Sequence, residues 1–322
     1  SILARSYSET GQFRADVHVK THGYAQGEFR VLPSLADELR QGLFEDEGAL
    51  PALVRFSNAA SQVQPDAFPD GRGMAIQVCG VSGEMVAGDV RSEATQDFVM
   101  INHPVFFARD VKDYLRLEQV LEQANDNPLA ALAGALTGGD WNPLHWHWRE
   151  ISTVAGIAAQ LPLHPASPTY CSIAPIRWGS FVAKYRAKPA GRGLESFLEL
   201  MPRLATEKDT MRLVLQETLR RQEVVFEFQA QLRTSPRTMP IEDATIEWPE
   251  SESPFQTVAQ LTLPRQEISD LELEEAFRKL SFSVWHALAA HRPLGGINRV
   301  RRQAYALSSA WRHQRSSAEG ES

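Results

Sequence analysis

Four segments of the sequence combine side chains that could carry out acid–base or ligand chemistry. His18 and Tyr305 offer the most reactive groups, because an imidazole titrates near neutral pH and a phenolate is a hard anionic ligand for a metal ion. Each segment on its own also has a simpler structural interpretation. The segments are RADVHVKTHG (14–23), VRFSNAA (54–60), VMINHPVFFARD (99–110) and RRQAY (301–305).

The first segment holds two histidines four residues apart. His18 lies in an alternation of polar and apolar residues, where a lone histidine is more often a core or surface residue than a base. In an extended chain His18 and His22 point to the same side, so a metal pair is one alternative. No carboxylate or third histidine recurs at ligand spacing, which argues against that alternative.

The other segments pair polar groups with apolar neighbours. Arg55 lies in a strand pattern, where a guanidinium must meet an anion or extend to solvent. Asn102 ends an apolar run before a His-Pro pair, and its simplest interpretation is a turn residue. Arg301 precedes Tyr305 by one helical turn, which would place a cation beside the phenol and favour the phenolate. The alternative is a solvated, arginine-rich helix.

Period-two and helical patterns indicate which elements must position these residues. Apolar residues alternate with other residues over 73–78, 226–233 and 255–263, and 97–102 is a short apolar run, so half-buried antiparallel strands are expected. Strands followed by helices and further strands favour an antiparallel barrel or sandwich with a helical insertion over an alternating α/β fold. Helical patterns occur at 110–121, 128–139, 149–161, 206–222 and 271–280.

Composition narrows the classes of function. The 322 residues include 33 Lys and Arg against 40 Asp and Glu, a net charge of −7 that argues against nucleic-acid binding. With 43% hydrophobic residues the chain can build a core, and no stretch is apolar enough for a membrane span. Two cysteines exclude a disulfide scaffold and a cysteine-rich zinc site, and they favour a cytoplasmic location.

Taken together, the segments resemble the haem catalase family, in particular its small, catalase-related peroxidase branch. The motifs follow in the family's order, and the resemblance covers most of residues 12–312. They are His18-Val19-Lys20, Arg55-Phe56-Ser57, Asp70-Gly71-Arg72-Gly73, the run from Asn102 to Asp110 (NHPVFFARD), and Arg301 with Tyr305.

The resemblance implies an α+β fold in which an antiparallel β-barrel encloses haem, with inserted and C-terminal helices and no C-terminal helical domain. It implies one catalase-like domain over 1–322, with a helical insertion at about 110–222 and a disordered tail at about 315–322. Haem b would supply the iron, and no NADPH is expected. The short segment before His18 further implies a monomer or simple homodimer.

Roles for individual residues follow from the same resemblance. Tyr305 would be the proximal iron ligand, kept as phenolate by Arg301. His18 would be the distal acid–base residue, oriented by Ser57, and Asn102 would donate a hydrogen bond to the peroxide. The other residues implied to bind haem are Arg55 and Arg312 at the propionates, with Phe107, Val17 and Arg14.

The implied activity is haem-dependent cleavage of the O–O bond of hydrogen peroxide or an organic hydroperoxide through a ferryl intermediate. A second peroxide or a small organic donor would then reduce that intermediate. Ala59 and Leu115 stand where the family has larger side chains, so a wider entrance is expected. One alternative is an isomerase or lyase of lipid hydroperoxides, but Val17 replaces the Thr of that branch. Another is a non-catalytic haem carrier or sensor.

Overall fold

The computed structural model describes the part of the chain that builds a barrel and most of its surroundings. The described residues are 20–58, 65–67, 70–86, 94–123, 134, 137, 140, 142–146, 148–158, 164–191, 197–269, 277 and 280–302.

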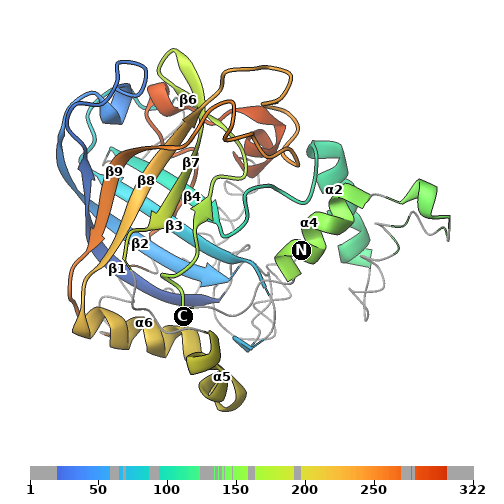
Figure 1. Cartoon of the computed structure of the whole chain (residues 1–322), viewed down its shortest axis with the longest axis horizontal. Helices are drawn as coiled ribbons and strands as arrows, with labels where there is room; N and C mark the ends of the chain where they lie inside the picture. Colours follow the sequence, from blue (N-terminus) through green and yellow to red (C-terminus); the bar gives the residue numbers. More distant parts are fainter. Residues whose placement is uncertain are drawn as a thin grey trace, which may run out of the picture.

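Eight antiparallel strands form a closed ring (Figure 1). Neighbours along the ring follow the order β5-β4-β3-β2-β1-β9-β8-β7, and β5 pairs with β7 to close it. The strand β6 pairs with the beginning of β7, on the same edge as β5. The strands are β1 (Thr21–Val31), β2 (Gly48–Asn58), β3 (Arg72–Cys79), β4 (Thr95–Ile101), β5 (Tyr170–Cys171), β6 (Ile176–Trp178), β7 (Phe181–Pro189), β8 (Val224–Leu232) and β9 (Gln256–Leu263).

Aromatic side chains pack against one another in the core of the barrel. Phe98 of β4 lies 4.6 Å from Phe228 of β8 between ring centroids, and Phe29 of β1 contacts both. The short helix η1 (Gly42–Phe44) inserts Phe44, which stacks on Trp178 at 4.4 Å. All five rings are fully buried, so apolar burial and close packing hold the barrel together.

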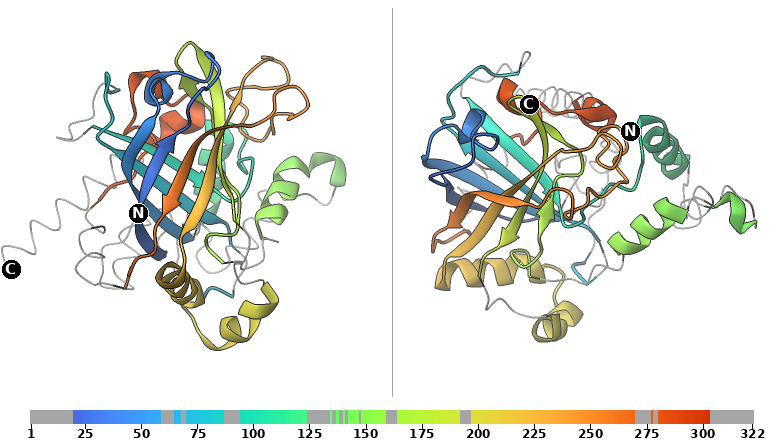
Figure 2. Two further views of the ribbon diagram at one scale, coloured as in Figure 1. Left: turned by 60° about the vertical axis from the view of Figure 1, so that its left-hand side comes forward. Right: turned by 45° about the horizontal axis from the view of Figure 1, so that its top comes forward.

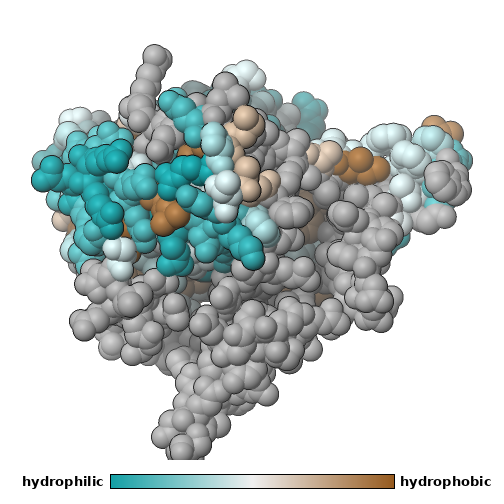
Figure 3. All heavy atoms as spheres, turned by 90° about the horizontal axis from the view of Figure 1, so that it is seen from below, coloured by the Kyte–Doolittle hydropathy of each residue, from teal (hydrophilic) through white to brown (hydrophobic). Residues whose placement is uncertain are grey.

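The helices lie outside the ring (Figure 2). The helix α6 covers one end of the barrel and packs Leu215 and Leu219 into the core. Seen from that end, the described surface is mostly hydrophilic (Figure 3). None of the helices in the described ranges is long and apolar enough to cross a membrane. The helices are α2 (Val111–Gln123), η2 (Pro143–His145), α4 (Trp148–Ala158), α5 (Phe197–Thr206), α6 (Thr210–Arg221) and η3 (Ala289–His291), and residues 295–302 are also helical.

The structure confirms the barrel and corrects the extent of the helical insertion. Predicted helices correspond to α2, α4 and α6, but β5, β6 and β7 also fall within 110–222. The strands β5 and β6 were not predicted because two or three residues are too few to show an alternating pattern. The strand β7 was not predicted because its outer face is rich in Lys and Arg. Residues 315–322, and most of 128–139 and 271–280, lie outside the described residues.

The expected half-burial of β3 and β4 is also wrong. Met74 and Phe98 face the barrel core, while Ala75 and Val99 belong to a second cluster with Trp285. A segment near the C-terminal end of the described chain therefore covers the outer face of these strands. The sequence pattern of two neighbouring strands could not reveal that cover.

A glycine on η1 is required by both backbone and packing. Gly42 has φ +57°, and a Cβ placed there would lie 2.7 Å from Cβ of Ala290. Gly80 has φ +71° with open space around it, so it isolates the backbone effect. We expect Gly80→Ala to lower the free energy of unfolding by about 1 kcal/mol, and Gly42→Ala by about 2 kcal/mol more. Urea unfolding checks both values, and equal losses would contradict the packing argument.

Candidate functional site

The structure describes half of the predicted site residues. Asn102, Ser57, Arg55, Arg301 and Phe107 are among the described residues. Those outside them are His18, Val17, Arg14, Tyr305 and Arg312, together with Ala59.

The ladder of β1 to β4 brings polar residues to one end of the barrel. Thr21 pairs with Ser57, Ser57 with Gly73, and Gly73 with Ile101. In an antiparallel sheet the start of one strand meets the end of the next. Ser57 and Asn102 therefore lie at the same end of the barrel. Thr21, the first residue of β1, lies at this end too, and it follows His18 by three residues in the sequence.

Asn102 is joined to Arg72 by two reciprocal hydrogen bonds. The backbone N–H of Arg72 donates to Oδ1 of Asn102 at 2.7 Å, and the backbone N–H of Asn102 donates to the carbonyl of Arg72 at 2.9 Å. Asn102 is 9% exposed. Because its amide oxygen is held by a backbone donor, the side-chain amide of Asn102 has a fixed orientation.

Arg55 is oriented by a hydroxyl on the neighbouring strand. Its Nε and one Nη donate to Oγ1 of Thr21 at 3.2 and 3.1 Å, and the guanidinium is half-buried. The contact places a cation at the same end of the barrel as Ser57 and Asn102. A cation in this position suits an acidic ligand group.

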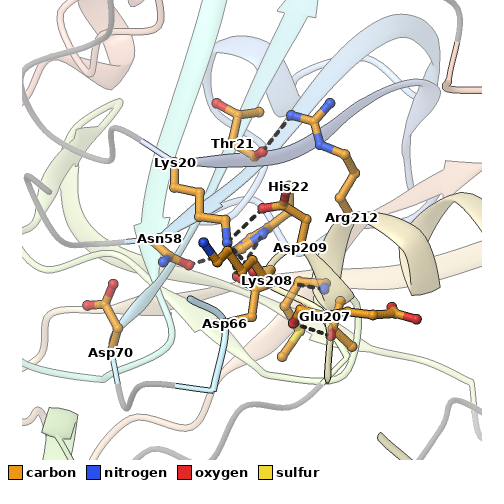
Figure 4. A network of polar contacts seen from close by, with 12 residues as sticks. Lys20, Thr21, His22, Asn58, Asp66, Asp70, Glu207, Lys208, Asp209 and Arg212 are labelled. Atoms are coloured by element: carbon orange, nitrogen blue, oxygen red, sulfur yellow. Dashed lines mark hydrogen bonds and ion pairs between the residues drawn. The ribbon is translucent and has the colours of Figure 1, made fainter. Parts of the chain in front are cut away.

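A buried ion pair anchors the beginning of β1 (Figure 4). Nζ of Lys20 lies 2.7 Å from Oδ1 of Asp66 and 2.9 Å from Oδ1 of Asp209, and it donates to the carbonyl of Lys208 at 2.7 Å. Oδ2 of Asp66 accepts from the backbone N–H of Met211 at 2.7 Å, in the first turn of α6. A carboxylate is favoured there by the helix dipole. The pair therefore ties β1 to α6.

A buried histidine lies beside this pair. Oδ1 of Asn58 is 3.0 Å from Nη1 of Arg72 and 2.6 Å from Nε2 of His22. A guanidinium only donates, so the Asn58 atom is an acceptor and Nε2 of His22 carries the proton. Burial, with added repulsion from Arg72 and Lys20, lowers the pKa of His22 well below its usual value. His22 is therefore neutral.

Sequence reasoning considered His22 only as half of a metal pair. Among the described residues no three His, Cys, Asp or Glu side chains gather as a metal site. Asn58 and Asp66 were missed. The asparagine directly after R-F-S was a visible signal for Asn58, but nothing in the local sequence marks Asp66, whose partners are distant along the chain.

The helix at 295–302, which precedes Tyr305 in the sequence, packs beside the Asn102 segment. Ile297 shares an apolar cluster with Ile101 and Phe106. Arg301 is half-buried, and its Nη1 donates to Oδ1 of Asn298 at 3.4 Å. The helix that carries Arg301 and the segment that carries Asn102 are thus neighbours in the fold.

Phe107 belongs to a group of aromatic rings after Asn102 that contact one another at tilted angles. It lies 4.1 Å from Phe106 and 6.2 Å from Tyr114 between ring centroids. All three rings are only partly buried, so this group presents aromatic surface next to the polar end of the barrel. Leu115, one helical position further, is 49% exposed on α2.

Comparison with known proteins agrees with this geometry. A family model described as Catalase matches residues 14–134. No curated protein sequence matches the chain. The match covers the first part of the chain, so it shows a likeness to this family over residues 14–134.

Solved catalases share the fold. Catalase A from Saccharomyces cerevisiae aligns over 94% of this chain and 62% of its own, with a TM-score of 0.72 and 18% identity. A bacterial catalase aligns over 94% of this chain and 58% of its own, with a TM-score of 0.71 and 17% identity. A fungal catalase aligns over 94% of this chain and 60% of its own, with a TM-score of 0.70 and 17% identity. The chain thus spans about 60% of the length of these catalases.

The described residues fit the haem that the family implies. Haem needs cations for its propionates, aromatic or apolar walls, and a polar donor on the peroxide side. Arg55 supplies a cation, the group around Phe107 supplies aromatic surface, and Asn102 supplies an oriented amide. These three features lie at one end of one barrel.

Buried histidines make stability depend on pH. Burial is the main cause that lowers the pKa of His22, His164 and His291, to about 4 for the last two. In the unfolded chain a histidine has a pKa of about 6.5. Below that pH the unfolded state binds more protons than the folded state, so the stabilisation is complete above pH 6.5 and is lost as the pH falls toward 4.

We therefore expect the free energy of unfolding to fall below pH 6.5 by about 1.4 kcal/mol per pH unit for each of these histidines. In His164→Gln the change in the free energy of unfolding per pH unit should be smaller by the contribution of one histidine. The control is His145→Gln, at a side chain that is 64% exposed. Urea unfolding at pH 5 to 7 measures the slopes, and an unchanged slope in His164→Gln would show that His164 is not neutral in the fold.

Proposed function

We propose that this protein is a haem enzyme that decomposes peroxide at the end of the barrel where β1 begins. The observation that carries the proposal is the amide of Asn102. Its oxygen accepts from the backbone N–H of Arg72 at 2.7 Å, which fixes the orientation of the amide at this end of the barrel. Such an oriented amide, in a barrel with the catalase fold, suits the recognition of a peroxide oxygen.

Several residues of the chain would hold the cofactor. Tyr305 would bind the iron as phenolate, with Arg301 keeping it deprotonated. Arg55 and Arg312 would pair with the propionates through charge-assisted hydrogen bonds. When bound, haem would supply the redox-active iron and the electrons that cleavage of the O–O bond requires.

The remaining chemistry is proton movement by the chain. His18 would take the proton from one peroxide oxygen through its imidazole and return it to the departing oxygen. Ser57 would orient that imidazole, and Nδ2 of Asn102 would donate to the peroxide. Because Ser57 and Asn102 lie at one end of the ladder, both can act on the same small ligand.

Release of dioxygen from hydrogen peroxide by the haem-loaded protein tests this function. We expect His18→Gln to slow peroxide consumption by a factor on the order of 100 or more, the usual contribution of a general acid–base residue. The matched control His145→Gln, at an exposed histidine, leaves the rate unchanged.

Other outcomes separate the alternatives. Peroxide consumption without gas indicates an organic donor as the reductant. Conversion of fatty-acid hydroperoxides to rearranged products, with hydrogen peroxide untouched, indicates an isomerase or lyase. If His18→Gln alters no peroxide reaction while haem stays bound, the protein is a haem carrier and the enzymatic proposal is wrong.

The proposal extends to organic hydroperoxides, because the side chains of Ala59 and Leu115 are smaller than those that the catalase family has at these positions. Ala59→Val is expected to reduce the rate with tert-butyl hydroperoxide several-fold while the rate with hydrogen peroxide changes little, since only the larger substrate meets the added methyl groups. Initial rates with both substrates measure the effect. An equal response of the two substrates excludes a role of this position in access.

A further inference from the structure

We propose that His22 and Asn58 position the amide of Asn102, acting through Arg72. The four residues lie on β1, β2 and β3 and directly after β4, and they form one continuous chain of hydrogen bonds across the end of the barrel. His22 and Asn58 are thus positioning residues for the peroxide site. The inference rests on the proposed function, because it assigns a purpose to the orientation of Asn102.

The first step is the contact between Asn58 and Arg72. Arg72 is 2% exposed, and the closest partner of its guanidinium is Oδ1 of Asn58 at 3.0 Å. The carbonyl of Asp66 is 3.3 Å away and a carboxylate oxygen of Asp70 is 3.8 Å away. Within the described part of the chain, Nε of Arg72 meets no hydrogen-bond partner. Removal of the Asn58 oxygen would therefore leave a buried cation poorly satisfied.

The second step runs from Arg72 to Asn102 through the backbone. Arg72 is the first residue of β3, and both its N–H and its carbonyl bond to Asn102. A shift of the guanidinium at this strand end moves the donor that holds the Asn102 oxygen. The direction of Nδ2 of Asn102 thus depends on a side chain that lies on the opposite side of Arg72.

The third step is the donor that holds Asn58. Nε2 of His22 donates to the same Oδ1 at 2.6 Å, so this one oxygen lies between two donors. The ring of His22 is 1% exposed and cannot exchange this bond for one with water. The Nε2–H that the neutral ring carries is therefore needed to seat Asn58 against Arg72.

Charges around the ring favour that neutral form. Nδ1 of His22 lies 3.8 Å from Oδ1 of Asp66, but that oxygen already pairs with Lys20 at 2.7 Å. A protonated ring would add a charge to a group whose cations and carboxylates already balance. The charged residues around His22 are Lys20, Arg72 and Arg212 against Asp66, Asp70 and Asp209.

Two variants of His22 test the proposal in the full-length, haem-loaded protein. His22→Gln keeps a donor at the Nε2 position and cannot titrate, whereas His22→Leu removes the donor at similar size. We measure kcat and KM for hydrogen peroxide, haem content, and the NMR resonance of the Asn102 side-chain amide. The leucine variant should lose about tenfold in kcat at unchanged KM and haem content, a size typical of residues that act through a neighbour. Its Asn102 resonance should shift.

The glutamine variant should rescue both readouts to within about twofold of the parent protein. His164→Gln is the control, because His164 is equally buried but bonds to Thr218 on α6. It should change stability alone. A leucine variant with unchanged kcat and an unchanged Asn102 resonance would overturn the proposal, as would a glutamine variant as damaged as the leucine variant.

Asn58→Asp covers the case in which His22→Leu does not fold. The carboxylate keeps both acceptor contacts, so the Asn102 resonance should stay in place while the added charge raises the pKa of His22. A displaced Asn102 resonance in this variant would contradict the positioning chain. If the parent protein turns over no peroxide, the proposed function fails, but the Asn102 resonances still decide whether His22 and Asn58 position that amide.

Discussion

Lys20 and Asp66 lie 2.7 Å apart with almost no exposure to solvent, and the candidate site depends on this ion pair. Removing two charges from water costs several kcal/mol per ion, so a buried pair is tolerated only when further bonds satisfy both groups. Here Lys20 also meets Asp209 and a backbone carbonyl, and Asp66 accepts from the first turn of α6. Few other placements of the β1 start would satisfy all of these groups. The pair thus specifies where the chain that follows His18 enters the barrel.

The same end of the barrel uses neutral polar groups for finer control. The ladder brings Ser57 and Asn102 to one level, but a ladder positions backbones and not side chains. Asn102 gains its orientation from the backbone of Arg72, and Arg72 from the oxygen of Asn58. An amide whose oxygen is held in this way keeps one orientation, and groups that are already oriented assist a reaction without reorganisation.

The sequence predicted the parts of this arrangement that are local. Alternation located β3 and β8, and the motif order located Ser57 and Asn102. The strands β5 to β7 were missed because a two-residue strand such as β5 exists only through its ladder partners on β4 and β7. Asp66 was missed for the same reason. Its partner Met211 is 145 residues away, and such a contact has no signature in either segment.

The charge state of His22 bears on the proposed role of His18. An acid–base residue works best when its neighbours do not titrate in the same range, because coupled groups release their protons as a pair. Burial lowers the pKa of His22 well below its usual value, and the surrounding cations oppose a further positive charge. His22 therefore stays neutral near pH 7 and does not compete for the proton that His18 would move. A histidine four residues after the acid–base residue can then act as a fixed donor to Asn58 and leave proton transfer to His18.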